Sequence, residues 1–209
     1  MDESTAMPQH TWITRTQFNG HIVRLESLDA PQHRDGLVAA GADPSIWTYV
    51  RFPPADTPAG MDAHIAELLR RRDAGEEVPY VVIQQSSNKV VGVTRFIELR
   101  PGHKGLELGT WLNPWVHGDG SNIEIKYLML QYAFEELGCI RVQIKTNANN
   151  AAAQRSLVAL GATYEGHFRN HYILHDGTVR DSLFYAIIDR EWPTVKAHIQ
   201  QRLARRTAP

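Results

Sequence analysis

A glycine-rich loop between residues 117 and 123 has the composition of an anion-binding site. Within the segment WLNPWVHGDGSNIEIK, a predicted strand ends, two glycines follow two residues apart, and a helix begins at once. Glycine allows close backbone approach, and the first N–H groups of a helix have no partner within it. We therefore expect the N–H groups of residues 120–123 to point towards an anion such as a phosphate. The alternative is a plain glycine turn that caps the helix, because the segment completes neither a Walker loop nor a dinucleotide fingerprint.

Three histidines, His167, His171 and His175, follow one another at four-residue steps and could line one face of a strand. Strand residues four apart are separated by roughly 13 Å, too far for two imidazoles to share one ion easily. We therefore expect no metal site in this segment. The remaining interpretations are a substrate pocket lined by Arg169, His171 and Asp181, or a plain hairpin surface.

The elements that must position these residues form an α/β fold of the α+β type. Apolar periodicity and turn residues predict strands over 21–27, 80–85, 90–99, 106–112, 140–146, 164–174 and 180–188, and helices over 35–40, 57–75, 122–137, 150–160 and 190–205. The polar links between the second, third and fourth strands are short, which implies antiparallel neighbours. The order predicts a mixed, mostly antiparallel sheet of six to seven strands flanked by helices.

The composition is that of a single globular domain. The chain has 209 residues, of which 43% are hydrophobic and 22% charged, and a domain of this size buries roughly 70% of its surface. We expect a loose N-terminal arm over 1–18, which Trp12 and Ile13 could anchor, and one domain over 19–206. Lysine and arginine number 22 against 23 acidic residues, whereas a general nucleic-acid binder usually has a strong basic excess. The charge balance therefore argues against nucleic acid as a partner.

The sequence predicts a cytoplasmic protein without a membrane partner. Its longest apolar run, residues 183–188, is far shorter than the roughly 20 residues of a membrane helix. The acidic start MDE is followed by no apolar stretch, so no signal peptide is expected. The one cysteine, Cys139, excludes an internal disulfide framework and fits a reducing compartment.

Several motifs, in order along residues 20–200, resemble the GNAT superfamily of acetyl-coenzyme A (acetyl-CoA) dependent N-acyltransferases. The likeness is closest to its branch of ribosomal-protein N-terminal (alanine/serine) acetyltransferases. The motifs are LELGTWLNP at 106–114, HGDGSN at 117–122, an asparagine followed eleven residues later by glycine (Asn150 and Gly161), EGHFRNH at 165–171 and DGTVRD at 176–181. The resemblance implies a GNAT fold that uses acetyl-CoA and needs no metal.

The resemblance also implies where the coenzyme binds. The family loop, Q/R-x-x-G-x-G/A, holds the pyrophosphate on its backbone, and it corresponds here to His117, Gly118, Asp119, Gly120, Ser121 and Asn122. His117 replaces the usual glutamine or arginine, and Asn122 replaces the last glycine or alanine. Asn150 and Arg155 are further coenzyme contacts. In the family the preceding strand separates from the next, pantetheine occupies the gap, and a backbone N–H near Trp111 or Leu112 stabilises the oxyanion.

For catalysis the resemblance implies direct attack by an amine on the thioester in a ternary complex. Glu107 matches the glutamate that removes the amine proton in some members, and the alternative is a strand carboxylate paired with a neighbouring base such as Arg95 or Lys126. Many relatives have a tyrosine acid where this chain has Leu157. Ser156 could donate the proton instead, or simply face solvent or a carbonyl.

The acceptor is expected to be a weakly basic amine. Deprotonating an α-amine at pH 7 costs about 1.1 kcal/mol, whereas a lysine costs about 4.6 kcal/mol. We therefore expect acetyl transfer to a peptide or protein N-terminal α-amine or to a small amine, and a homodimer is compatible with this activity. The competing hypothesis is a non-catalytic acyl-CoA sensor or interaction module on the same fold.

Overall fold

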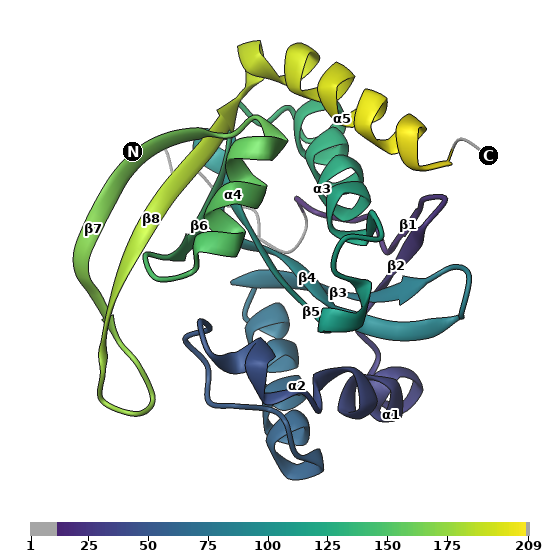
Figure 1. Cartoon of the computed structure of the whole chain (residues 1–209), viewed down its shortest axis with the longest axis vertical. Helices are drawn as coiled ribbons and strands as arrows, with labels where there is room; N and C mark the ends of the chain where they lie inside the picture. Colours follow the sequence, from purple (N-terminus) through teal and green to yellow (C-terminus); the bar gives the residue numbers. More distant parts are fainter. Residues whose placement is uncertain (1–11, 208–209) are drawn as a thin grey trace, which may run out of the picture.

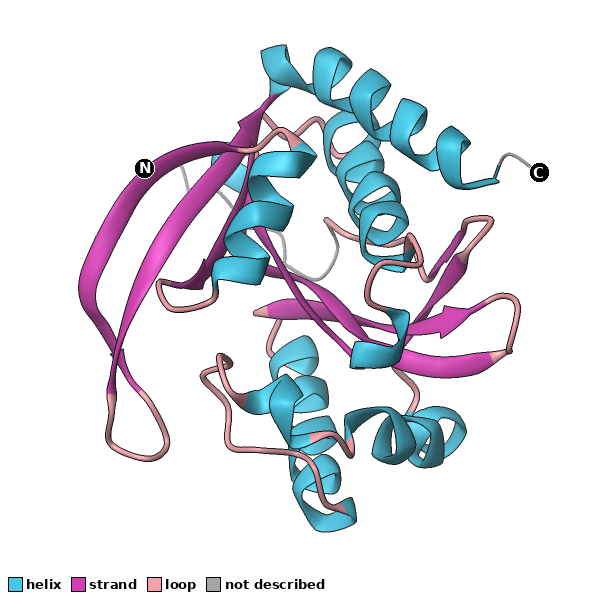
Figure 2. Ribbon diagram, viewed as in Figure 1, coloured by secondary structure: helices cyan, strands magenta, loops and turns pink. Residues whose placement is uncertain are grey.

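One eight-stranded sheet organises the chain, with helices on both of its faces (Figures 1 and 2). The computed structural model describes residues 12–207, so part of the expected arm, residues 1–11, lies outside the described residues. In spatial order the strands run β1-β2-β3-β4-β5-β6-β8-β7, and only β5 and β6 are parallel neighbours. Their bounds are β1 Gln17–Asn19, β2 Val23–Ser27, β3 Glu77–Gln84, β4 Lys89–Arg100, β5 Gly105–Leu112, β6 Arg141–Asn147, β7 Thr163–Ile173 and β8 Val179–Ile188. The predicted mixed, mostly antiparallel sheet is confirmed, with one strand more than expected.

The additional strand, β1, lies in the segment that was expected to be a loose arm. Ile13 and Phe18 from this segment are buried. The Phe18 ring meets Tyr80 and Tyr132 edge-on, with centroids 5.2 and 5.4 Å apart, which is a favourable aromatic geometry. Residues 12–18 therefore lie against the core through their apolar side chains, unlike the loose arm predicted there.

Helices cover both faces of the sheet (Figure 1). α1 (Ala30–Gly41) and α2 (Pro58–Asp73) pack on the first face, which we call the α2 face. α3 (Ser121–Gln131), α4 (Ala151–Leu160) and α5 (Trp192–Thr207) pack on the second. Each face of the sheet therefore has its own hydrophobic core.

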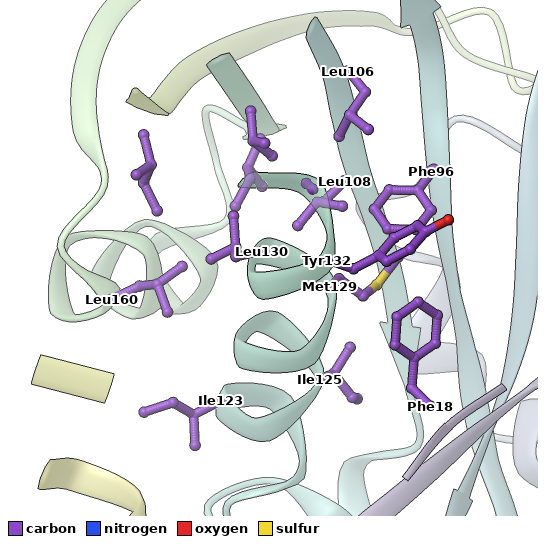
Figure 3. Packing of buried hydrophobic residues seen from close by; sticks show 14 of the residues in the cluster. Phe18, Phe96, Leu106, Leu108, Ile123, Ile125, Met129, Leu130, Tyr132 and Leu160 are labelled. Atoms are coloured by element: carbon purple, nitrogen blue, oxygen red, sulfur yellow. The ribbon is translucent and has the colours of Figure 1, made fainter. Parts of the chain in front are cut away.

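The larger core lies between α3 and the sheet. Figure 3 shows Phe18, Phe96 and Tyr132 grouped beside Met129 of α3. The helix continues as one π-helical turn, Tyr132–Glu136, which places the Tyr132 ring in this group. The helix predicted over 122–137 thus corresponds to α3 together with this turn.

β5 and β6 separate part-way along their length. They pair only where Gly105–Glu107 lies beside Arg141–Gln143. Beyond that point β5 continues to Leu112 against β4, and β6 continues to Asn147 against β8. The resulting β5–β6 gap opens towards the carboxyl ends of both strands, after which α3 and α4 begin. Crevices beyond the carboxyl ends of parallel strands are common ligand sites in α/β sheets.

A buried carboxylate on α3 holds the turn between β1 and β2. Glu124 accepts hydrogen bonds from the backbone N–H groups of His21, Ile22 and Val23 at 2.9, 2.7 and 2.7 Å. Its side chain is almost fully buried, and so is Val23, whereas Ile22 is half-buried and His21 is exposed. Gly20 is needed beside the carboxylate, because a Cβ there would lie 2.3 Å from Glu124 Oε2.

Replacing Glu124 should therefore destabilise the fold strongly. Glu124→Ala leaves three backbone donors without this acceptor, of which that of Val23 is buried, and is expected to lower the free energy of unfolding by about 3 kcal/mol or more. Glu124→Gln keeps one acceptor oxygen and should fall between that variant and the wild type. Urea unfolding measures both effects. The exposed Glu76→Ala is the matched control, and equal effects at positions 76 and 124 would contradict the role of this carboxylate.

Candidate functional site

The loop before α3 has the backbone shape that its glycines suggested. Gly118 and Gly120 have φ values of +88° and +106°, a region that side-chain-bearing residues rarely adopt. Gly120 is the N-cap residue of α3, and His117 and Asn122 beside it are exposed. The N–H groups of Asn122 and Ile123 have no acceptor within the helix. The loop therefore offers main-chain donors at the positive end of a helix dipole.

The carboxylate of Asp119 takes up one of these donors. Asp119 Oδ1 accepts the Ser121 N–H at 2.7 Å, and Oδ2 accepts from Ser121 Oγ at 3.0 Å and from Gln84 Nε2 at 2.9 Å. Of the N–H groups expected to face an anion, that of Ser121 is thus already bonded to a side chain. Asp119 also brings a negative charge to the loop, which the glycine pattern did not reveal.

The first turn of α3 contacts the middle of α4. Asn122 Nδ2 donates to Ser156 Oγ at 3.3 Å, so the predicted coenzyme loop and the predicted proton donor are in contact. Asn150 caps α4, because its Oδ1 accepts the Ala153 N–H at 3.0 Å. Arg155 lies exposed on the same helix. The fold therefore gathers the predicted coenzyme residues of α3 and α4 at the mouth of the β5–β6 gap.

Backbone alternation decides which N–H groups of β5 face the gap. Asn113 donates its N–H to Val91 of β4 at 2.8 Å. Successive strand residues direct their backbone groups to opposite sides, so Trp111 also faces β4, while Thr110 and Leu112 face the gap. Of the two expected oxyanion donors, this geometry favours Leu112. The Trp111 side chain is buried against α2, with its ring centroid 6.3 Å from that of His64.

Glu107 lies at the closed end of the gap, on the α2 face. Only 1% of the residue is exposed. Its carboxylate accepts from Gln143 Nε2 at 2.8 Å and forms an ion pair with Lys145 Nζ at 2.9 Å. Glu107 is therefore a strand carboxylate paired with a base, as the alternative from the sequence held, but the base is Lys145 and the partners named there, Arg95 and Lys126, are wrong. Arg95 pairs with a different carboxylate, and Lys126 approaches from the α3 side of the sheet, which alternation places opposite Glu107.

The α2 face beyond Glu107 is lined by cationic and aromatic side chains that the motif analysis did not select. The β7–β8 hairpin curves down beside the segment before α2 (Figure 1), where Arg180 Nη1 donates to the Tyr49 carbonyl at 3.0 Å. The side chains of this lining are Arg51, Phe52, His64, Arg95, Lys145, His171, Tyr172, Arg180 and Phe184. One sequence signal could have revealed this lining, namely a charged residue, such as Lys145, within a predicted buried strand.

His171 belongs to this lining. Its ring centroid lies 3.9 Å from that of Tyr172 and 5.4 Å from those of Phe168 and Phe184. Burial lowers the pKa of His171, and the nearby cations, first among them Lys145, lower it further. The imidazole is therefore neutral at pH 7. Its Nδ1 is buried and has no partner among the described residues.

The other two predicted substrate residues lie apart from His171. Asp181 accepts the Asn170 N–H at 2.7 Å and lies 2.8 Å from His167 Nε2. These bonds stabilise the irregular part of β7, where the residue after Arg169 has a φ of +51°. Asp181 alternates with Arg180 along β8 and so faces the opposite side of the sheet. Arg169 is exposed and acts electrostatically on Asp181, so of the three predicted substrate residues only His171 lies in the lining of the α2 face.

Other kinds of site are limited within residues 12–207. There, no group of three or more histidine, cysteine or acidic side chains could hold a metal ion. None of the described helices combines the length and the apolar character needed to cross a bilayer. Two hollows of about 550 and 310 Å³ are lined by residues 12–17 with 132–137, and by residues 44–56 with 174–176. Neither hollow includes the loop before α3.

Lys126 is a buried amine directly beneath the gap. Its Nζ donates to Thr110 Oγ1 at 2.5 Å, and that hydroxyl lies 2.9 Å from Thr94 Oγ1. Burial lowers the pKa of Lys126 from 10.5 to about 8. Among residues 12–207, its hydrogen-bond partner is the neutral Thr110 and no carboxylate pairs with it, so the cost of the buried charge is only partly offset.

This shift predicts how stability depends on pH. Because the folded-state pKa is below the unfolded value, the unfolded chain binds more protons between about pH 8 and 10.5, and the free energy of unfolding rises with pH there. Lys126→Met removes the titrating group. The free energy of unfolding of the wild type, relative to this variant, should therefore increase by about 3 kcal/mol over this range. Urea unfolding at several pH values measures it, and a pH-independent difference would contradict the burial of a titrating amine.

Comparison with known proteins gives the family. Residues 23–163 match the family described as the acetyltransferase (GNAT) domain. The uncharacterized N-acetyltransferase YoaA of Bacillus subtilis (strain 168) is 28% identical to this chain over 107 residues. That match covers 50% of this chain and 59% of YoaA, so the chain spans less than two thirds of this relative.

Solved structures extend the similarity to most of the chain. A GCN5-related N-acetyltransferase from Brucella melitensis is 28% identical with a TM-score of 0.85, over 92% of this chain and 87% of the other. A protein of T. thermophilus assigned as an acetyltransferase is 37% identical with a TM-score of 0.83, over 92% and 99%. Mycobacterium smegmatis RimJ, in complex with CoA-disulfide, has a TM-score of 0.73 over 88% and 90% but only 17% identity, so it shows the fold alone. Because the family match spans more than half of its residues, the chain belongs to the GNAT acetyltransferase family and is a GNAT-family N-acetyltransferase.

Proposed function

We propose that this protein transfers an acetyl group from acetyl-CoA to a primary amine by direct attack within a ternary complex. The observation that carries the proposal is the β5–β6 gap, which connects the anion-binding loop to the buried carboxylate of Glu107. An extended, amide-bearing arm in this gap would replace the missing strand pairing and use the N–H groups of Thr110 and Leu112. One elongated site could thus hold a phosphate at its mouth and a reacting carbonyl at its closed end.

The residues around the gap suit coenzyme A. We assign the coenzyme contacts to the loop over 117–122, to Trp111 and Leu112 on β5, and to Asn150 and Arg155 on α4. The two glycines of the loop and the dipole of α3 favour a diphosphate. Asp119 opposes it electrostatically, so the main-chain donors must outweigh this charge.

The chemistry needs three groups. The amine nitrogen forms a bond to the thioester carbonyl carbon, the C–S bond breaks, and sulfur leaves as a thiolate with the bonding electrons. Glu107, directly or through water, takes the proton that the amine loses. The Leu112 N–H stabilises the oxyanion as negative charge develops, and Ser156 is the proposed proton donor to the thiolate.

The proposed acceptor is an amine of low pKa, as found at peptide and protein N-termini and in small α-amines. The neutral His171 and the aromatic rings of the α2 face supply a half-buried wall for its side chain. We also propose that the chain belongs to the ribosomal-protein branch of the family. This part rests on the sequence motifs, because the identity to RimJ is only 17%. A cytoplasmic location is also part of the proposal, and the single cysteine suits it.

Two observations favour a non-catalytic acyl-CoA sensor as the second candidate. The carboxylate of Glu107 already accepts from Lys145 and Gln143, so these side chains occupy oxygen lone pairs that an amine proton would need. Leu157 stands where many relatives have a tyrosine acid. A sensor would bind the coenzyme without releasing its thiol in the presence of amines.

Glu107→Gln tests the catalytic assignment. The amide cannot accept the amine proton, so kcat should fall by about 100-fold or more, while the Kd for acetyl-CoA changes by less than about twofold. Thiol release with a panel of α-amines measures kcat, and titration calorimetry measures Kd. Glu76→Gln, which alters an exposed carboxylate, should change neither. Full turnover in Glu107→Gln would exclude this residue as the base, whereas tight binding without any thiol release by the wild type would favour the sensor.

Asp119→Asn tests the anion-binding loop. Asparagine can still accept the Ser121 N–H but removes the negative charge beside the proposed diphosphate, so the affinity for coenzyme A should rise several-fold at low salt. The gain should shrink as added salt screens the charge. Asp73→Asn at the exposed end of α2 is the control and should leave the affinity unchanged. A weaker affinity in Asp119→Asn would place the diphosphate elsewhere.

A further inference from the structure

Three cations surround the ring of Tyr172 on the α2 face. Cζ of Arg51 and Cζ of Arg180 lie 5.2 and 5.9 Å from the ring centroid, and Lys145 Nζ lies 5.7 Å from it. We call these four residues the Tyr172 cluster. They come from the segment before α2 and from β6, β7 and β8, so only the tertiary fold brings their charges together.

Arg180 is buried without an ionic partner. Only 7% of it is exposed, and its hydrogen-bond acceptors are neutral, namely Ser182 Oγ at 3.2 Å and the Tyr49 carbonyl at 3.0 Å from its nitrogens. Within residues 12–207, neither Arg180 nor Arg51 forms an ion pair. A guanidinium has five N–H donors, and an uncompensated buried charge is costly. The arrangement therefore leaves donors and charge available to an anionic ligand.

Two carboxylates act electrostatically on these arginines, Glu107 on Arg180 and Glu77 on Arg51, but each forms its ion pair with another cation. Glu77 bonds Arg95 at 3.0 Å, and Glu107 bonds Lys145 at 2.9 Å. Glu98, which also acts electrostatically on His171, is exposed to solvent. The two arginines of the Tyr172 cluster thus form a surplus of positive charge beside the proposed base.

The same wall carries an unsatisfied polar atom. Nδ1 of His171 is buried without a partner among the described residues, and its ring packs against Tyr172. Buried polar groups normally find a hydrogen-bond partner. A ligand with polar atoms at the cluster would supply one.

We propose that the acceptor amine carries a carboxylate, which Arg51 and Arg180 bind, so that the substrate is an amino carboxylate such as a free amino acid. This inference rests on the proposed function and deepens it. Lys145 lies between the two subsites, since it pairs with Glu107 and also borders Tyr172. One small molecule could therefore present its amine to Glu107 and its carboxylate to the arginines, whose forked donors match a carboxylate.

The test compares acids with their amides on the full chain. Thiol release from acetyl-CoA is measured with the proteinogenic amino acids, with the corresponding amino acid amides, and with dipeptide amides that begin with glutamate. We expect kcat/KM for the best amino acid to exceed that of its amide by at least about tenfold. Calorimetry of the CoA-saturated protein with N-acetyl amino acids and their amides makes the same comparison without turnover.

Two variants and one control identify the residues. Arg51→Met, at a half-buried position with no ion pair among the described residues, should lower kcat/KM for the acid and leave that for the amide unchanged, so that the ratio approaches one. Arg180→Lys keeps the charge but loses the fork and should reduce the ratio less. Arg190→Met, an exposed arginine elsewhere, should leave the ratio unchanged.

The outcomes separate the two proposals. Equal use of acids and amides by a protein that binds acetyl-CoA overturns the carboxylate subsite and leaves the acetyltransferase function intact. Absence of acetyl-CoA binding overturns the proposed function and this inference with it. A preference for glutamate-starting dipeptide amides over free glutamate supports the carboxylate subsite but overturns the free amino acid as its source.

Discussion

The separation of β5 from β6 is the constraint on which the site depends. Parallel strands normally exchange hydrogen bonds along their shared length, and an unpaired strand edge is a binding surface. Beyond Glu107 the facing backbone groups of these two strands have no ladder partner between them. The helices that follow the strands begin at the open end, so a ligand that replaces the missing ladder also meets two helix N-termini. Chain topology alone thus produces both the slot and the charge at its mouth.

Most of the fold could be predicted from the sequence because its signals are local. Thr57 and Pro58 indicated the start of α2, and Thr57 Oγ1 indeed accepts the Gly60 N–H at 3.1 Å. Apolar alternation located the longer strands in the same way. β1 was missed because its three residues, Gln17–Asn19, are too few to show a period. Its stability comes from the ring of Phe18, which packs on residues far away in the chain.

The candidate site could be predicted only in part, because only those of its features that depend on neighbouring residues are visible in the sequence. The loop before α3 depends on neighbouring residues, so its glycines and helix start were visible. The partner of Glu107 was not, because Lys145 is 38 residues away and reaches it only through strand pairing. Lys126 seemed an equally good partner until alternation placed it on the other face of the sheet. The cationic lining of the α2 face likewise requires a hairpin and a loop to meet.

The position of Glu124 has a thermodynamic consequence. Glu124 lies in the first turn of α3, three residues after Ser121, and its carboxylate fastens the turn between β1 and β2. Order in the N-terminal strands and order at the start of this helix are therefore two parts of one cooperative unit. An anion that binds at the start of α3 stabilises this helix start. By thermodynamic linkage, the same binding free energy stabilises the N-terminal edge of the sheet against local opening.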